Sequence, residues 1–118
     1  MEDNPIVSKS FSFALRIVKL SRHVSEKHKE FTLSREVLSS GTNIGRYVKA
    51  AVSSESKENF ILNMGRALQH ADITEYWLRL IHFADQINQA EYESIERDRK
   101  ELAKMLTAIT KTSKAEQL

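Results

Sequence analysis

The chain has 118 residues, of which 41% are hydrophobic and 29% charged, and its formal net charge is +2. This length fits one domain with one core, and the composition is too apolar for a disordered chain. One proline and three glycines are too few for the turns of an all-β fold. The absence of cysteine excludes disulfides, thiol catalysis and Cys-based zinc sites. Without a signal pattern or a membrane-length apolar run, we expect a cytoplasmic protein that does not enter the membrane.

The first predicted helix covers about residues 8–28. Its start falls between Asn4 and Ser10, because Asn4-Pro5 could serve as an N-cap followed by a first-turn proline. Two neighbouring apolar rows predict a broad buried stripe on this helix. One row contains Val7, Phe11, Ala14 and Val18, and the other contains Phe13, Ile17, Leu20 and Val24.

The second predicted helix covers about residues 32–52, with Thr32 or Ser34 as its N-cap. Two glycines lie inside it, and each costs about 0.8–1 kcal/mol relative to alanine. Glycines four residues apart share one face, which favours the close approach of another helix. Contact with a phosphate backbone is the functional alternative. The predicted packing or subunit contact consists of Gly41, Thr42, Asn43 and Gly45.

The third predicted helix covers about residues 54–84 and is capped by Ser53 and Ser54. Its apolar positions alternate four and three residues apart, as in a heptad seam. The seam contains Phe60, Met64, Ala67, Ala71, Thr74, Leu78 and Ile81.

The fourth predicted helix covers about residues 89–112 and opens with a capping box of Asn88 and Glu91. Its polar tail, from Thr110 onward, is expected to fray. Its seam contains Tyr92, Ile95, Leu102, Leu106 and Ile109. Because the connections are short, neighbouring helices should run antiparallel. The expected fold is therefore all-α: an antiparallel up-down four-helix bundle forming a single domain over residues 1–118.

Three stretches in order resemble a known family. Ser40-Gly41-Thr42-Asn43-Ile44-Gly45, followed by Ala50-Ala51, resembles a small-residue signature in the family's second helix. Lys9-Ser10-Phe11 with Phe13-Ala14 resembles its opening, and Thr74-Glu75-Tyr76-Trp77-Leu78 resembles its most distinctive motif. Over about residues 8–110 the chain thus resembles the 23S rRNA intervening-sequence proteins, a family of bacterial four-helix bundles.

This resemblance implies a left-handed bundle that assembles into a ring, commonly a homopentamer, without enzymatic activity or a cofactor. A related branch serves as the accessory protein of diversity-generating retroelements and binds nucleic acid and a reverse transcriptase. The chain departs from the family pattern at Arg46-Tyr47, where small residues and asparagine are common.

Basic residues concentrate in the first half of the chain. Residues 8–30 carry a net charge of +4 and residues 31–53 a net charge of +2, whereas residues 54–86 are net acidic. Such a stripe can neutralise phosphates, although a solvated bundle face is the plainer interpretation. No aromatic residue interleaves it at exposed-looking positions, so binding should follow shape and charge without base stacking. The candidate phosphate contacts are Arg16, Lys19, Arg22, Arg35, Arg46 and Lys49.

Glu75 lies in the most apolar part of the third predicted helix, beside Tyr76 and Trp77. We expect Glu75 to be buried and to form a salt bridge with an arginine or a hydrogen bond across a bundle or subunit seam. Arg79 gives an ordinary pair on the same helix, and Arg66 or Arg46 could be an interhelical partner. The two aromatic residues are expected in the core and in a subunit interface, because this helix has more apolar surface than one bundle can cover. No histidine follows a glutamate by three residues, the spacing that di-iron bundles use, so no metal site is predicted. The four histidines are His23, His28, His70 and His82.

The leading functional hypothesis is a non-enzymatic oligomer that binds structured RNA or DNA electrostatically. The alternative is a protein–protein scaffold or accessory subunit, for example for a reverse transcriptase, without a direct role in nucleic-acid binding. An enzyme is the weakest hypothesis, because no nucleophile and base, phosphate-cradling loop or carboxylate pair is recognisable.

Overall fold

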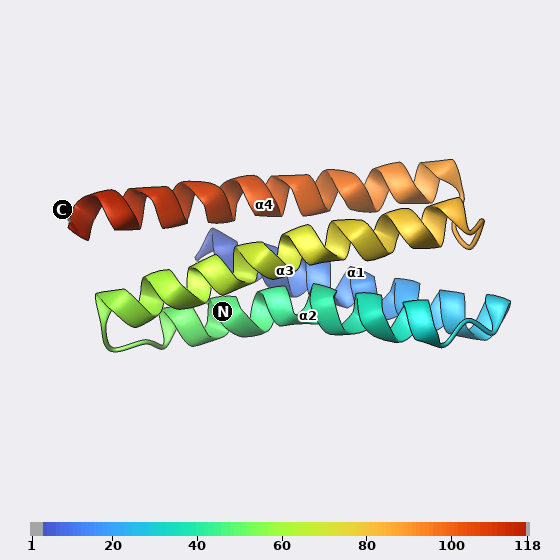
Figure 1. Cartoon of the computed structure of the whole chain (residues 1–118), viewed down its shortest axis with the longest axis horizontal. Helices are drawn as coiled ribbons and strands as arrows, with labels where there is room; N and C mark the ends of the chain where they lie inside the picture. Colours follow the sequence, from blue (N-terminus) through green and yellow to red (C-terminus); the bar gives the residue numbers. More distant parts are fainter. Residues whose placement is uncertain (1–3, 118) are drawn as a thin grey trace.

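Four long helices make up the computed structural model, which describes residues 4–117. They are α1 (Pro5–His28), α2 (Thr32–Val52), α3 (Lys57–Phe83) and α4 (Gln89–Gln117). Successive helices run antiparallel, and both the α1–α2 and the α3–α4 turns lie at the same end of the bundle (Figure 1). The predicted all-α four-helix fold is confirmed.

Local hydrogen bonds explain where the helices begin. The Asn4 side chain accepts from the backbone N–H of Ile6, and Pro5 occupies the first position of α1. The predicted capping box of α4 is present, because Asn88 and Glu91 each accept the other's backbone N–H, at 2.8 and 2.9 Å. At α2 the carboxylate of Glu30 accepts from two backbone N–H groups, and neither Thr32 nor Ser34 is the N-cap.

Three helix boundaries differ from the predicted ranges. α1 starts three residues earlier, at its cap, and α3 starts at Lys57 because Ser56, rather than Ser53 or Ser54, is its N-cap. α4 continues to Gln117 and does not fray at Thr110. The extension is anchored, since Thr110 and Ser113 are buried and an ion pair joins Lys57 to Glu116 at 2.5 Å.

The core runs along the bundle axis. In α3, every predicted seam position from Met64 to Ile81 is at most 1% exposed. In α1, Phe13, Ile17 and Val24 are buried as predicted, but Phe11, in the row with Val7, Ala14 and Val18, is 65% exposed. The buried face of α1 continues instead through Ile6 and Ser10, which keep the four-and-three spacing with the buried row.

The bundle is least tightly closed between its first and last helices. Each helix packs extensively on its neighbour in sequence, whereas α1 and α4 touch each other much less. Two ion pairs bridge this seam, Lys9 with Glu101 and Arg16 with Asp98. A groove of about 500 Å³ remains between the two helices.

Candidate nucleic-acid interface

Arg16 is engaged within the bundle. One of its Nη atoms lies 2.6 Å from an Asp98 oxygen, and the guanidinium also donates to the backbone carbonyl and hydroxyl of Ser94. These three contacts hold α1 to α4, so Arg16 offers less free charge to a ligand than an unpaired arginine.

Lys19 and Arg22 remain on the surface of α1, both exposed. Lys19 lines the α1–α4 groove together with Arg16 and His23, opposite Glu91 on α4. The predicted stripe on α1 is therefore partly turned toward α4, and its free charges are those of Lys19 and Arg22.

The three predicted cations of α2 are all exposed: Arg35, Arg46 and Lys49. Within residues 4–117, none of the three forms an ion pair with a carboxylate. Arg46 donates from Nε to the side-chain oxygen of Asn43 at 2.9 Å, a contact that leaves its charge uncompensated.

The ring of Tyr47 makes cation–π contacts with two arginines from different helices. The guanidinium carbon of Arg46 lies 4.5 Å from the centroid of the Tyr47 ring, and that of Arg66, on α3, lies 5.9 Å from it. The His70 ring stacks on Tyr47 with a centroid separation of 5.3 Å and an interplanar angle of 18°. An aromatic side chain thus lies beside the cations here, but Tyr47 is half-buried, so it does not contradict the expectation that no aromatic residue interleaves the stripe at exposed positions.

His70 is held uncharged near neutral pH. Its burial, and secondarily the positive charge of Arg46, lower the pKa of the imidazole below its ordinary value. Its Nδ1 is buried without a hydrogen-bond partner among the described residues.

The two helix glycines differ in their surroundings. A Cβ on Gly41 would stand 2.7 Å from Ile17 Cγ1, so α1 and α2 approach too closely there for any side chain. A Cβ on Gly45 would meet the backbone oxygen of Ser10 at 3.5 Å, an ordinary contact. Thr42 and Asn43 are half-buried, and the Thr42 hydroxyl donates to the Leu38 carbonyl at 2.6 Å.

Glu75 forms a salt bridge with an arginine across a bundle seam, as expected, but it is not buried and its partner is none of the arginines named from the sequence. Its side chain is 45% exposed, and its partner is Arg99 on α4, at 3.4 Å, instead of Arg79, Arg66 or Arg46. The guanidinium of Arg99 is only 5% exposed and binds both oxygens of the buried Glu96, at 2.5 and 3.0 Å. Burial by itself lowers the pKa of Arg99, but the hydrogen bond and charge of Glu96, with Glu75 and Asp72, raise it overall.

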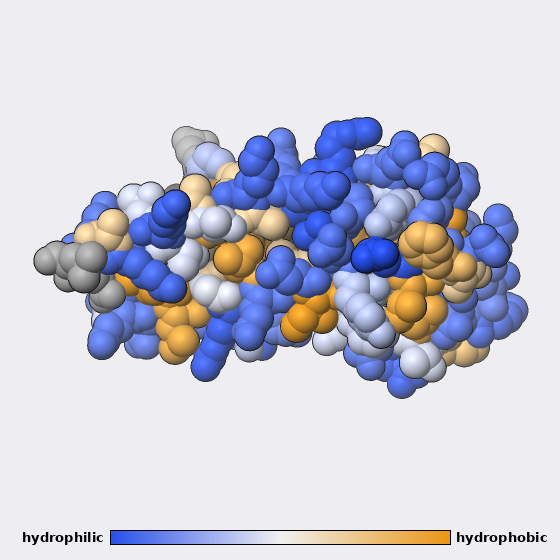
Figure 2. All heavy atoms as spheres, turned by 45° about the horizontal axis from the view of Figure 1, so that its top comes forward, coloured by the Kyte–Doolittle hydropathy of each residue, from blue (hydrophilic) through white to orange (hydrophobic). Residues whose placement is uncertain are grey.

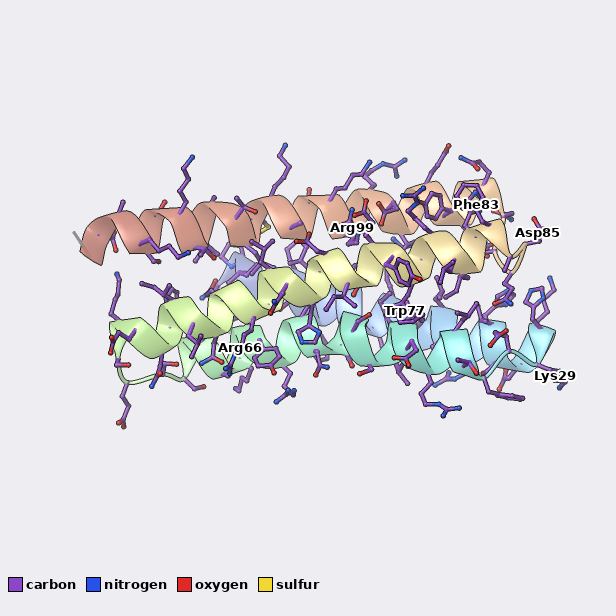
Figure 3. All side chains as sticks on the ribbon, viewed as in Figure 1. Lys29, Arg66, Trp77, Phe83, Asp85 and Arg99 are labelled. Carbon is purple, nitrogen blue, oxygen red and sulfur yellow. The ribbon has the colours of Figure 1, made fainter. Side chains whose placement is uncertain are left out.

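An apolar face lies on the outer side of α3. Tyr76, Leu80 and Phe83 are exposed and line a groove with Asp72, Glu75 and Arg79. Trp77 is half-buried against the core and meets Tyr76 edge-on at 5.0 Å. Figure 3 shows Trp77 beside α2, and Phe83 near the end of α3 that leads into α4. Hydrophobic atoms gather near this end of the bundle in Figure 2 as well.

Sequence reasoning missed Arg66, His70 and the buried pair of Glu96 with Arg99. Arg99 was detectable, because the predicted seam of α4 skips from Ile95 to Leu102 and Arg99 occupies the vacant position. The role of Arg66 was not detectable from the sequence, because only the packing of α3 on α2 brings this residue to Tyr47.

Between residues 4 and 117, no group of three or more His, Asp or Glu side chains could hold a metal ion. Over the same part of the chain, no helix has both the length and the apolarity needed to span a membrane.

Comparisons with known proteins agree on a family. Residues 2–108 match the model of the family described as 23S rRNA-intervening sequence protein. None of the curated proteins compared matches the sequence. The chain is 40% identical to a crystallised protein of unknown function from the S23 ribosomal protein family of Bacteroides thetaiotaomicron, with a TM-score of 0.90. That match covers 94% of this chain and 99% of the other. The chain therefore belongs to the 23S rRNA-intervening sequence protein family.

Proposed function

We propose that this protein is a non-enzymatic, self-associating helical bundle that binds structured RNA or DNA through the basic surface of α1 and α2. The observation that carries the proposal is the free charge of that surface. Its cations are exposed and, within residues 4–117, form no ion pair: Lys19, Arg22, Arg35, Arg46 and Lys49. Phosphate neutralisation by such cations releases counterions and needs no particular base sequence.

Self-association, as a pentamer by the resemblance noted above, is the second part of the proposal. Phe11 and Leu15 on α1 and Tyr76, Leu80 and Phe83 on α3 are large apolar side chains left exposed by the single bundle. α1 and α3 occupy diagonal positions in the bundle, each packed between α2 and α4, so these two apolar faces lie at separate corners. Two different faces on one subunit favour head-to-tail contacts that close into a ring, and a ring repeats the basic surface on every subunit.

The binding test is fluorescence anisotropy with a labelled RNA hairpin and a DNA duplex at several salt concentrations. We expect affinity to fall steeply with salt, and to be lost in the triple variant Lys19→Glu, Arg22→Glu and Lys49→Glu. A matched charge change on α4, Lys100→Glu with Lys104→Glu and Lys111→Glu, should retain more of the affinity. Equal binding by the wild type and the α1–α2 variant would remove this surface from consideration.

Sedimentation tests the assembly separately. Phe11→Ser and Phe83→Ser each remove an exposed ring and should shift the protein toward smaller species at micromolar concentration. A wild-type protein that sediments as a single stable copy would refute self-association. In that case the α3 face would be free for a different protein, as the scaffold alternative requires.

A further inference from the structure

Arg46 and Arg66 form a pair of like charges that the fold holds together. They come from α2 and α3, and both guanidinium carbons lie within 6 Å of the Tyr47 ring centroid. Arg66 lies where α3 faces α2 (Figure 3). Across residues 4–117, no carboxylate pairs with either arginine. Two cations that share one ring repel each other, and an anion between them removes that repulsion.

The aromatic support keeps these arginines in place. Tyr47 is half-buried and is backed by His70, whose ring is nearly parallel to it. Cation–π contact restricts each guanidinium to the neighbourhood of the ring, so less side-chain freedom is lost when a ligand binds. Arg35 and Lys49 are also exposed on α2, but they make no cation–π contact among the described residues.

We propose that Arg46 and Arg66, held on the ring of Tyr47, bind one phosphate group. The guanidinium fork matches the oxygens of phosphate. Both guanidinium carbons lie within 6 Å of the same ring centroid, so the two flexible side chains can turn toward one compact, highly charged anion. The imidazole of His70 and the guanidinium of Arg46 already lie against the Tyr47 ring, so a nucleobase does not stack on it. The site therefore recognises the phosphate itself.

The phosphate has two possible sources. When it belongs to RNA or DNA, the inference rests on the proposed function and locates one backbone contact of that surface. When it is a free phosphate, the site stands without nucleic-acid binding.

The test combines two titrations with the wild type, Arg66→Gln and the control Arg35→Gln, each checked for helix content by circular dichroism. In the first, inorganic phosphate is added at constant ionic strength and followed by amide and imidazole NMR signals. We expect saturable shifts at Arg46, Arg66 and His70 in the wild type and in Arg35→Gln, and their loss in Arg66→Gln. Shifts spread over all lysines and arginines, or unchanged by Arg66→Gln, overturn the site.

In the second titration, a labelled RNA hairpin is the probe. Loss of a charged hydrogen-bonding partner should weaken RNA affinity about tenfold in Arg66→Gln and about twofold in Arg35→Gln. Equal weakening in the two variants overturns the site as a nucleic-acid contact while leaving the proposed function intact. If the wild type binds no RNA but shows the localised phosphate shifts, the proposed function fails and the phosphate site is retained.

Discussion

The buried ion pair of Arg99 with Glu96 is expected to dominate the electrostatic contribution to stability. The two side chains are 5% and 7% exposed, and Glu96 accepts two hydrogen bonds from the guanidinium. Arg99→Met keeps the length of the side chain but leaves Glu96 as a charge without a partner inside the bundle. Removing one member of a buried pair costs about 3–5 kcal/mol. For a chain of this size that corresponds to a fall in Tm of about 12–20 °C.

Because of Glu75, the two single variants Glu96→Gln and Arg99→Met should lose different amounts of stability. In Glu96→Gln, Arg99 keeps the carboxylate of Glu75 at 3.4 Å and the Ala71 carbonyl at 3.5 Å, so we expect a smaller loss than in Arg99→Met. In Arg99→Met, the half-exposed Glu75 is solvated by water and does not compensate Glu96.

The assay is urea unfolding at pH 7, followed by circular dichroism, on the single variants and on Arg99→Met with Glu96→Leu. Replacing both charges with apolar groups should restore stability to within about 1 kcal/mol of the wild type, or raise it. The control is the exposed pair of Lys9 with Glu101, where Lys9→Met should cost less than about 1 kcal/mol. An Arg99→Met variant as stable as the control, or a double variant no better than Arg99→Met, would refute this reasoning.

Two further predictions concern a glycine contact and a titrating ring. Gly41→Ala should destabilise the protein by about 1–3 kcal/mol, because the added Cβ collides with Ile17. Gly65→Ala should stabilise it by about 1 kcal/mol, because a Cβ there meets nothing within 4 Å. If thermal unfolding gave both variants a stability change of the same sign, the packing role of Gly41 would be contradicted. The unfolded chain protonates His70 before the folded protein does, because folding lowers the pKa of His70, so unfolding free energy should fall as pH drops below about 6.5. His70→Gln should flatten that slope in urea unfolding between pH 7 and 5, and an unchanged slope would contradict the assignment.

The sequence by itself determined the secondary structure and most of the core. Heptad spacing on α3 identified every buried position from Met64 to Ile81, since the period of a helix fixes which side chains share a face. Caps formed within three residues, such as Asn88 with Glu91, were also readable because both partners lie next to each other in the chain.

Only the tertiary structure decided which charges meet. Arg16 was counted as a free cation, yet packing of α1 beside α4 places it on Asp98, 82 positions away. The same kind of long-range contact brings Arg66 to Tyr47 and Glu75 to Arg99. Helical periodicity determines the direction in which a side chain points, but its partner depends on how the helices are rotated and offset against one another. That arrangement is set by the packing of the whole core.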